Sequence, residues 1–326
     1  MEITTKKRMM LFTGSADPPL AKEIADHLGM RLSDVKLSRF ASGEIYVRFD
    51  DSVRGSDAFV IQSHADPVNE SIMEQAIMID ALKRASAKRI TAVVPYYGYS
   101  RQDKKTLARE PITAKLVADI LTVAGADRVM SVDLHSGQIQ GFFDFPFDHL
   151  TALPILAGYL REELGLEDGN LVVVAPDAGR VKTAERLREQ LDSELAYIYK
   201  RRSRLEAHKI ETMVVEGDVD GRACVLVDDM IDTAGTITAG AQVLREHGAT
   251  DIYAVATHPV FSGEAVKRLA DAPIRGVVVT NTLPIPEDRR LDKITVLSVA
   301  PIMAAAIKAV FEEESVSELF HGENMP

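Results

Sequence analysis

Short apolar segments and longer amphipathic segments alternate along almost the whole chain. The apolar segments have the length of strands, as in residues 58–61, 171–175 and 224–227, and continuous apolar runs are typical of strands buried on both faces of a parallel sheet. The amphipathic segments repeat apolar residues at helical spacing, most clearly over residues 68–85. We therefore predict an α/β protein in which mainly parallel sheets are flanked by helices.

The remaining predicted elements continue this alternation through both halves of the chain. Strands are expected at residues 11–15, 44–49, 90–97, 128–134, 195–199, 252–257, 276–280 and 295–299. Helices are expected at residues 18–29, 111–124, 153–164, 181–191, 238–247 and 264–270, and a last helix runs through residue 311. The alternation pauses between residues 143 and 154, and a chain of 326 residues is long enough for two cores. We predict an N-terminal domain at residues 1–150 and a C-terminal domain at residues 151–326.

The chain carries 38 basic and 49 acidic side chains, which gives a net charge of −11. This balance argues against a nucleic-acid partner, and it means that a phosphate ligand needs local cations or a divalent metal. The longest apolar runs have strand length, so we expect no membrane span and no membrane partner. The apolar run after the basic N-terminus is too short for a signal peptide, which favours a cytoplasmic protein. The single cysteine, Cys224, excludes an internal disulfide.

The most informative segment is residues 225–237, Val-Leu-Val-Asp-Asp-Met-Ile-Asp-Thr-Ala-Gly-Thr-Ile. The predicted strand stops at Asp228 and Asp229, a loop of small and hydroxyl side chains follows at residues 232–236, and a helical pattern begins at Ile237. In open α/β sheets, ligands bind beyond the carboxyl ends of the strands, and a helix start offers N–H groups and a positive dipole end to a phosphate. The order of these features predicts a ligand site.

The residue types in this segment suit a sugar phosphate better than a nucleotide. The adjacent carboxylates Asp228 and Asp229 can accept hydrogen bonds from the two hydroxyls of a ribose 2,3-diol, while Thr233, Thr236 and loop amides suit its 5-phosphate. Gly235 lets a ligand approach the backbone closely. A Walker loop is excluded because Gly240 is followed by Ala241-Gln242, where a Walker loop requires Lys-Ser/Thr. The alternative interpretation is an acidic turn that caps a helix.

Residues 225–237 resemble the PRPP-binding motif of type I phosphoribosyltransferase folds, and the form found at residues 228–236 is similar to that of class I ribose-phosphate pyrophosphokinases, or PRPP synthetases. The resemblance covers nearly the whole chain. It implies two phosphoribosyltransferase-like domains, Mg²⁺ as cofactor, ATP and ribose 5-phosphate as substrates, and a homohexamer whose active site is completed across subunits. It also implies a ribose 5-phosphate site formed by Asp228, Asp229, Asp232, Thr233, Ala234, Gly235 and Thr236, together with Arg202.

Two further segments carry the implied ATP site. Residues 40–44 are similar to the family's Phe-Ser-Asp-Gly-Glu loop, which reaches the ATP of a neighbouring subunit, so the resemblance implies ATP contacts from Ser42, Gly43 and Glu44. Ser42 stands where the family has Asp. The resemblance also implies adenine and phosphate contacts from Arg101 and Gln102, which follow the predicted strand at residues 90–97. Without the resemblance, each segment is an ordinary turn or solvated loop.

The resemblance assigns Mg²⁺ to His135 and Asp177. The chemistry of the side chains alone favours Mn²⁺ at an imidazole, or a buried, hydrogen-bonded histidine. Strand alternation places Asp133 and His135 on the same side of the predicted strand at residues 128–134. Family members commonly have Gly-Gly where this chain has Gly179-Arg180, so an added cation is expected near the phosphate.

Further roles are implied for two polar clusters. Lys200 and Arg202, at the end of a predicted strand, match the family's catalytic basic residues, although a basic cluster is ordinarily a solvated face. Residues 315–320 resemble the family's regulatory tail, which implies allosteric phosphate or ADP contacts from Ser315, Ser317 and Phe320, with Gln138 as a further partner. The alternative for this tail is a frayed helix end.

Together these segments imply transfer of the diphosphoryl group of Mg-ATP to the 1-hydroxyl of ribose 5-phosphate, which gives PRPP and AMP for nucleotide and amino-acid biosynthesis. One alternative is a phosphoribosyltransferase that consumes PRPP, although such an enzyme needs neither Arg101 and Gln102 for ATP nor a first domain of this design. Another is a regulatory homologue without activity, against which the retained Lys200, Arg202 and His135 argue.

Overall fold

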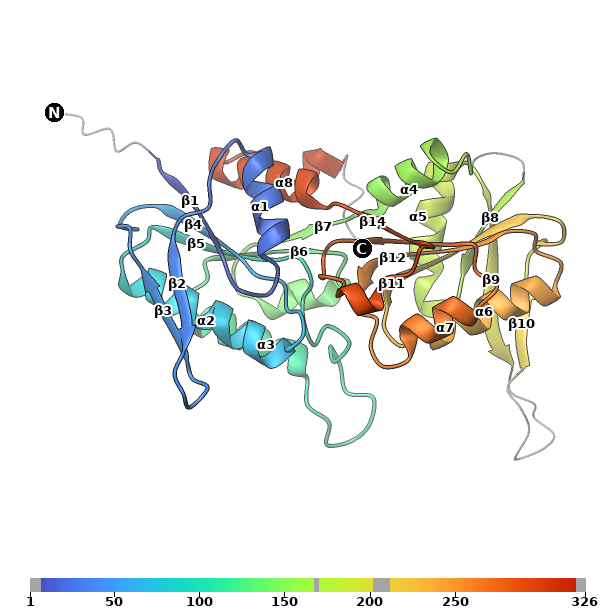
Figure 1. Cartoon of the computed structure of the whole chain (residues 1–326), viewed down its shortest axis with the longest axis horizontal. Coiled ribbons are helices and arrows are strands. Elements are labelled where there is room, and N and C mark those ends of the chain that lie inside the picture. The colour runs from blue at the N-terminus through green and yellow to red at the C-terminus, as the bar shows by residue number, and fades with distance from the viewer. Residues whose placement is uncertain (1–6, 167–169, 202–211, 321–326) are drawn as a thin grey trace. The chain divides into compact units, whose positions relative to one another are not determined.

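The computed structural model describes residues 7–166, 170–201 and 212–320, and the chain divides into two compact α/β units (Figure 1). Unit 1 contains the chain up to Thr151 together with residues 282–284 and the segment from Ser298 onward. Unit 2 contains residues 152–281 and 285–297. The prediction that the second domain runs to the C-terminus is therefore wrong for the last helix. That helix returns to unit 1 because its alanine-rich face packs against the first helix of the chain.

Unit 1 is built on a five-stranded parallel sheet with the order β1-β4-β5-β6-β7. The strands are β1 (Met9–Thr13), β4 (Asp57–Ile61), β5 (Arg89–Val94), β6 (Arg128–Val132) and β7 (Phe147–Leu150). Helices α1 (Pro18–His27) and α8 (Ala300–Glu312) cover one face, and α2 (Val68–Arg84) and α3 (Thr113–Ala124) cover the other (Figure 1). An antiparallel hairpin of β2 (Val35–Arg39) and β3 (Ile45–Phe49) projects from this unit.

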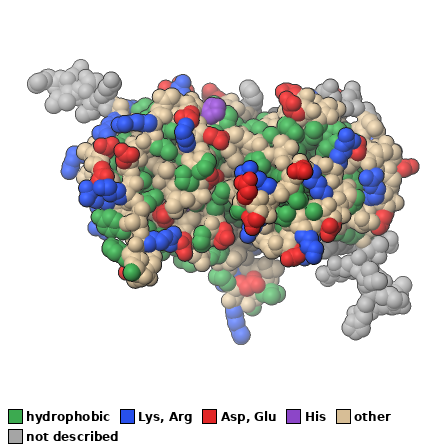
Figure 2. Space-filling model, in the orientation of Figure 1, with side chains coloured by type: hydrophobic (Ala, Val, Ile, Leu, Met, Phe, Trp, Pro, Cys, Tyr) green, Lys and Arg blue, Asp and Glu red, His purple; other side chains and the backbone are tan. Residues whose placement is uncertain are grey.

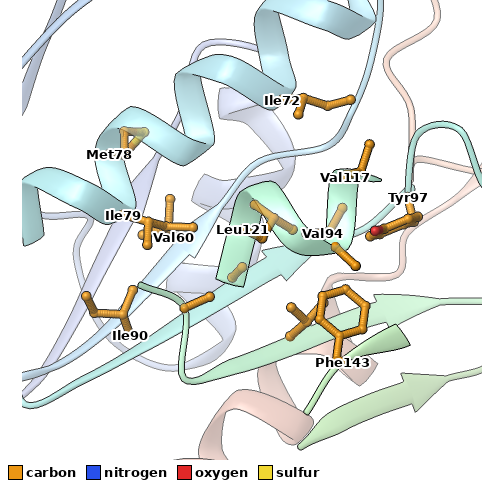
Figure 3. Packing of buried hydrophobic residues seen from close by; sticks show 14 of the residues in the cluster. Val60, Ile72, Met78, Ile79, Ile90, Val94, Tyr97, Val117, Leu121 and Phe143 are labelled. Atoms are coloured by element: carbon orange, nitrogen blue, oxygen red, sulfur yellow. The ribbon is translucent and has the colours of Figure 1, made fainter. Parts of the chain in front are cut away.

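The core of unit 1 lies between its sheet and the helix pair α2 and α3. Val60 of β4, Ile79 of α2 and Leu121 of α3 are fully buried there (Figure 3). At one end of this core the ring of Tyr97 meets that of Phe143 edge to face, with ring centroids 6.2 Å apart. The Tyr97 hydroxyl donates to the Ala114 carbonyl over 3.0 Å, so the chain is anchored where it leaves β5.

Unit 2 is built on a seven-stranded sheet with the order β10-β9-β8-β11-β12-β13-β14, in which β10 is antiparallel to β9 and every other pair is parallel. The strands are β8 (Leu171–Ala175), β9 (Glu194–Arg201), β10 (Thr212–Glu216), β11 (Ala223–Ile231), β12 (Ile252–Pro259), β13 (Gly276–Thr280) and β14 (Ile294–Leu297). Helices α4 (Leu153–Glu162) and α5 (Val181–Leu191) cover one face, and α6 (Gly235–Glu246) and α7 (Ala265–Asp271) cover the other.

Strand β11 is longer than its apolar sequence predicts. The expected strand ended before Asp228, whereas the observed strand continues to Ile231. Neighbouring strand β12 supplies the reason, because it pairs with β11 through Asp228↔Ala256 and Ile231↔Pro259, while pairing with β8 stops at Leu226↔Val174. Asp228 and Asp229 therefore belong to the last part of β11, which pairs with β12 but extends beyond its pairing with β8.

Two short strands of unit 1 were not predicted. Strand β7 lies inside the segment that the sequence indicates as a passage between domains, and β2 precedes the predicted strand at residues 44–49. Both are four or five residues long and only partly buried, so neither carries the continuous apolar run that identifies the central strands.

Basic and acidic side chains are interspersed on the face shown in Figure 2, where no large area has charge of one sign. Among the described residues, no helix has both the length and the apolar character needed to cross a bilayer. Cys224 is a free cysteine buried in β11, and burial raises the pKa of its thiol to about 12, as expected for a packing residue.

Candidate functional site

The strand order of unit 2 creates one point at which the chain reverses its direction of winding. From β8 the chain moves outward to β9 and β10, and it then returns to the other side of β8 as β11 and continues through β12 to β14. The carboxyl ends of the adjacent strands β8 and β11 therefore border the crevice where ligands bind in doubly wound sheets. This position brings the residue Asp177, which follows β8, to the same edge of the sheet as Asp228 and Asp229.

The segment after β8 is a short 3-10 turn, η2 (Ala178–Arg180), that leads directly into α5. Asp177 caps this turn, since its Oδ1 accepts from the Gly179 amide over 2.8 Å. The Asp177 side chain is otherwise exposed at the edge of the sheet. The turn directs Arg180 toward the neighbouring strand β11.

Arg180 binds both carboxylates of the predicted diol site. Its Nε lies 2.7 Å from Asp228 Oδ1, and its Nη2 lies 3.0 Å from Asp229 Oδ1. These three side chains are 13%, 14% and 7% exposed, so the cluster is largely removed from water. Burial and the adjacent Asp229 carboxylate raise the pKa of Asp228, and the Arg180 guanidinium opposes them. The sequence predicted an added cation near the phosphate, and the structure brings it to the acidic pair.

The loop after β11 is short and held by local contacts. The Asp232 carboxylate accepts from the Ser262 hydroxyl, and the Arg268 guanidinium donates to the Thr233 carbonyl over 2.9 Å. Ala234, the residue before α6, has a left-handed backbone with φ +61°, a conformation that costs a residue with a Cβ about 1 kcal/mol. Helix α6 begins at Gly235, two residues before the predicted start at Ile237.

The start of α6 has the features of an anion site. Within the described residues, no side chain caps this helix, and the first amides of any α-helix lack partners inside the helix. Thr233 and Thr236 are exposed beside this start, whereas Ala234 and Ile237 are buried. The exposed hydroxyls of Thr233 and Thr236 therefore lie at the positive end of the helix dipole.

Two glycines of α6 serve different purposes. A Cβ added at Gly240 would lie 3.3 Å from Ile198 Cδ1 and from Leu226 Cδ2, so this glycine allows close packing of the helix on the sheet. A Cβ added at Gly235 would meet nothing closer than 3.7 Å. The fold itself therefore has room for a side chain at Gly235, and its absence leaves space for a ligand.

Of the predicted catalytic residues, Lys200 lies in β9, where its backbone pairs with Met213 of β10. Strand β9 is parallel to β8, so Lys200 stands near the carboxyl end of its strand, on the same edge of the sheet as Asp177 and the acidic pair. Arg202 lies outside the described residues. The catalytic roles of both residues stay predictions.

Unit 1 contains a cavity of about 790 Å³ between the start of α2 and the loop that follows β5. Arg101 and Gln102 contribute to its lining, together with Asn69, Glu70 and Tyr99. Its size falls within the usual range for small-molecule pockets. The predicted ATP contacts Arg101 and Gln102 therefore border one cavity within this unit.

A buried histidine anchors the loop that borders this cavity. His64 Nδ1 accepts from the Gly98 amide and Nε2 donates to Gln75 Oε1, both over 3.0 Å, which assigns the neutral tautomer. Burial lowers the pKa of His64 to about 4. The Gln102 side-chain oxygen accepts from the Thr113 hydroxyl over 2.6 Å, which ties the end of the loop to α3.

Residues 40–44 form the turn of the β2–β3 hairpin. Gly43 has φ +92°, a left-handed conformation suited to glycine, and the Ser42 hydroxyl donates to the Glu44 carboxylate over 2.6 Å. Phe40 is 57% exposed and its ring meets that of Tyr46 edge to face. The segment is thus an exposed turn, and its predicted contacts with a neighbouring subunit's ATP stay untested.

The strand predicted at residues 128–134 ends before His135. Strand β6 ends at Val132, and Asp133 has a left-handed backbone with φ +37°, so strand geometry does not set the directions of the next side chains. Leu134 is nevertheless buried between the partly exposed Asp133 and His135. The Leu134 amide donates to His149 Nε2 over 2.9 Å, which fixes the backbone beside His135.

The residues predicted to bind Mg²⁺ belong to different units, His135 to unit 1 and Asp177 to unit 2. Within the described residues, no group of three or more His, Cys, Asp or Glu side chains is arranged to hold a metal ion. Mg²⁺ commonly uses one or two carboxylates together with substrate phosphates. The exposed Asp177 carboxylate fits that kind of site.

The predicted allosteric residues all belong to unit 1. Ser315 and Ser317 are exposed, as is Gln138, which accepts from the Ser136 hydroxyl. Phe320 ends a short 3-10 turn and is only 6% exposed. A ligand could contact the Phe320 ring only after that ring is uncovered.

Family models match both halves of the chain. The N-terminal domain of ribose phosphate pyrophosphokinase matches residues 9–125, and the phosphoribosyl synthetase-associated domain matches residues 202–321. The ribose-phosphate pyrophosphokinase of Streptomyces avermitilis is 55% identical over 320 residues, which cover 98% of this chain and 98% of that protein. The chain belongs to the ribose-phosphate pyrophosphokinase family. This membership confirms the resemblance inferred from residues 228–236.

Further members of the ribose-phosphate pyrophosphokinase family match over similar lengths. The Mycobacterium tuberculosis protein is 53% identical over 319 residues, which cover 98% of this chain and 97% of that protein. The crystal structure of phosphoribosylpyrophosphate synthetase from Mycobacterium smegmatis matches at 54% identity with a TM-score of 0.88, over 94% of this chain and 100% of that one. The predicted fold class, with two phosphoribosyltransferase-like domains, is confirmed.

Sequence reasoning missed two partners of the family motif, Ser262 and Arg268, and it placed Arg180 near the phosphate instead of at the acidic pair. Arg180 had one available signal, because it replaces the second glycine after Asp177. Ser262 and Arg268 follow β12 and carry no pattern of their own, so only the pairing of β12 with β11 brings them to the loop.

Proposed function

We propose that this chain catalyses the transfer of the diphosphoryl group of ATP to the 1-hydroxyl of ribose 5-phosphate. The observation that carries the proposal is the pair Asp228 and Asp229 beside the start of α6, at the point where a mainly parallel sheet reverses its direction of winding. The two carboxylates can accept hydrogen bonds from a diol, and the helix start can donate hydrogen bonds to a phosphate, so one short segment offers both.

The sugar phosphate is bound by the motif residues. Asp228 and Asp229 accept from the ribose 2- and 3-hydroxyls, while Thr233, Thr236 and the first amides of α6 donate to the 5-phosphate. Gly235 leaves room for that phosphate, since a Cβ there would meet nothing within 3.7 Å. Arg202 adds a cation to the same site, and Asp232 is held by Ser262 so that the loop keeps its shape.

The chemical step needs little covalent help from the protein. The ribose O1 forms a bond to the β-phosphorus of ATP, the bond from that phosphorus to the oxygen bridging to the α-phosphorus breaks, and AMP leaves with its electron pair. The proton of the 1-hydroxyl is lost to solvent or to a basic group. Catalysis then consists of positioning the two substrates and of offsetting the negative charge on the transferred group and on the leaving AMP. We assign the offsetting of charge to Lys200 and Arg202.

Mg²⁺ bound through Asp177, His135 and the phosphates would supply further positive charge to the transferred group. In unit 1, we assign the cavity bordered by Arg101 and Gln102 to the nucleotide, with Ser42, Gly43 and Glu44 completing the site of a neighbouring subunit. A homohexamer, a cytoplasmic location and an allosteric role for Gln138, Ser315, Ser317 and Phe320 belong to the same proposal.

Product analysis separates this reaction from its alternatives. The chain is incubated with ribose 5-phosphate, ATP and Mg²⁺, with and without inorganic phosphate, and AMP and PRPP are measured. A PRPP-consuming phosphoribosyltransferase would give neither product, and a regulatory homologue would bind ATP without turnover. Either result would refute the proposal.

The Lys200→Ala variant tests the catalytic assignment. Losing one cation at the transferred group should lower kcat about 100-fold or more, by analogy with loss of one oxyanion-hole donor. The control is Lys22→Ala, which removes an exposed lysine of α1 that pairs with Asp26 of the same helix. Unchanged PRPP formation by Lys200→Ala would refute the assignment.

A further inference from the structure

The contact of Arg180 with both acidic residues is the feature that the reaction leaves unexplained. One guanidinium reaches two neighbouring carboxylates, over 2.7 Å to Asp228 and 3.0 Å to Asp229. The planar fork of an arginine can bind two acceptors at once with fixed geometry, which a lysine cannot do. The arrangement therefore fixes the positions of the two carboxylates relative to each other.

Arg180 forms an ion pair with each of the two carboxylates. Both ion pairs are made to Oδ1, and the Asp229 amide also donates to Asp228 Oδ1 over 2.8 Å. A carboxylate has two oxygens and about four acceptor positions. Because a carboxylate has more acceptor positions than one ion pair uses, contact with Arg180 does not by itself prevent hydrogen bonds from a sugar diol.

The charges of the cluster explain why such a partner is needed. Two carboxylates on consecutive residues, 14% and 7% exposed, repel each other strongly where water is largely excluded. The guanidinium, itself 13% exposed, offsets this repulsion. Without it, the side chains would turn apart or take up a proton, and either change removes one of the two acceptors.

We propose that Arg180 is a positioning residue that holds Asp228 and Asp229 as a paired acceptor for the ribose 2,3-diol and thereby makes the enzyme select ribose 5-phosphate over 2-deoxyribose 5-phosphate. This inference rests on the proposed function, because it assigns the acidic pair to the sugar. It adds a determinant of sugar specificity that lies outside the motif, because Arg180 follows β8 whereas the motif residues lie in β11 and at the start of α6.

The test compares Arg180→Gln and Arg180→Lys with the wild type in steady-state AMP formation. In Arg180→Gln, the KM for ribose 5-phosphate should rise about tenfold or more, as expected for a weakened charge-assisted hydrogen bond, while kcat and the KM for ATP stay within about twofold. The preference in kcat/KM for ribose over 2-deoxyribose 5-phosphate should fall by a similar factor. Arg180→Lys keeps the charge and should recover only part of the selectivity.

Arg222→Gln is the matched control. Arg222 precedes β11 at the opposite end of the same strand, is 11% exposed and pairs with Glu194 over 2.6 Å. Removing Arg222 tests the cost of deleting a largely buried arginine from this sheet. The KM and the sugar preference of Arg222→Gln should equal those of the wild type.

Several results would overturn the inference. A lower KM for ribose 5-phosphate in Arg180→Gln would mean that Arg180 competes with the sugar, and a fall in kcat alone would place its effect on the transferred group. A change of the same size in Arg222→Gln would indicate a general structural effect. If Arg180→Gln does not fold, full selectivity in Arg180→Lys overturns the paired-acceptor role. A wild type that forms no AMP, or does not distinguish the two sugars, refutes the proposed function instead.

Discussion

Alanine substitutions at Gly235 and Gly240 should separate binding from packing within a single helix. Both glycines lie in α6 (Gly235–Glu246), so each substitution removes the same backbone freedom from the unfolded chain. Gly→Ala at a compatible helical position stabilises a protein by about 0.5–1 kcal/mol. Differences between the two variants must then come from what the added methyl group meets.

At Gly240 the methyl group would lie 3.3 Å from Ile198 Cδ1 and from Leu226 Cδ2. These contacts belong to the buried core of unit 2, where overpacking costs about 1–3 kcal/mol. After the helical gain is subtracted, Gly240→Ala should lower the free energy of unfolding by about 1 kcal/mol, without changing the KM for ribose 5-phosphate.

At Gly235 the nearest atoms to the methyl group are Arg268 Nη1 and Thr233 Oγ1, both at 3.7 Å. Gly235→Ala should therefore be as stable as the wild type or slightly more stable. The methyl group would instead occupy space that the 5-phosphate needs. Displacing one charge-assisted hydrogen bond costs about 1.5–3 kcal/mol, which raises the KM for ribose 5-phosphate about tenfold or more.

Urea unfolding and AMP formation with varied ribose 5-phosphate measure the two effects independently. The expected result is a crossed pattern, in which one variant loses stability and the other loses affinity. An unchanged KM in Gly235→Ala would show that the phosphate does not approach the start of α6. Greater stability in Gly240→Ala would show that the core yields to the methyl group and that the packing argument is wrong.

Two further predictions concern stability in unit 1. The pKa of buried His64 is lowered to about 4 from 6.5. Below pH 6.5, His64 therefore becomes protonated in the unfolded chain while it stays neutral in the folded chain. The free energy of unfolding should for this reason fall by about 2 kcal/mol between pH 7.5 and 5. Urea unfolding of His64→Gln should show a smaller fall, and an equal fall would contradict the assignment. Gly14→Ala should lower the free energy of unfolding by about 1–3 kcal/mol, because its Cβ would lie 2.3 Å from Gln62 Oε1. Calorimetry that shows no loss of stability would mean that Gln62 rotates away without cost.

The central strands and most helices could be predicted because their signals are local. A strand such as β8, buried at every position, must be apolar throughout, and α2 must repeat apolar residues at helical spacing to cover the sheet. The helix start and the small residues at 232–236 are also local features, and they indicate a phosphate site without knowledge of the rest of the fold. The ligand-binding motif therefore did not depend on tertiary information.

Other features depend on which segments become neighbours. Strand β11 extends to Ile231 because β12 continues to offer backbone partners, and α8 joins unit 1 because its alanine-rich face fits against α1. An apolar face in a sequence shows that a helix packs, but it does not show against what.

The sequence by itself determined the alternating α/β architecture, the acidic pair, the phosphate-binding loop and the family. Tertiary structure alone decided that Arg180 binds Asp228 and Asp229, that Ser262 holds Asp232, and that Gly235 is open while Gly240 is packed. The physical reason is that periodicity and residue type follow from the nearest few positions along the chain. Contacts across neighbouring strands arise only when hydrogen-bonded pairing sets the order and register of the sheet.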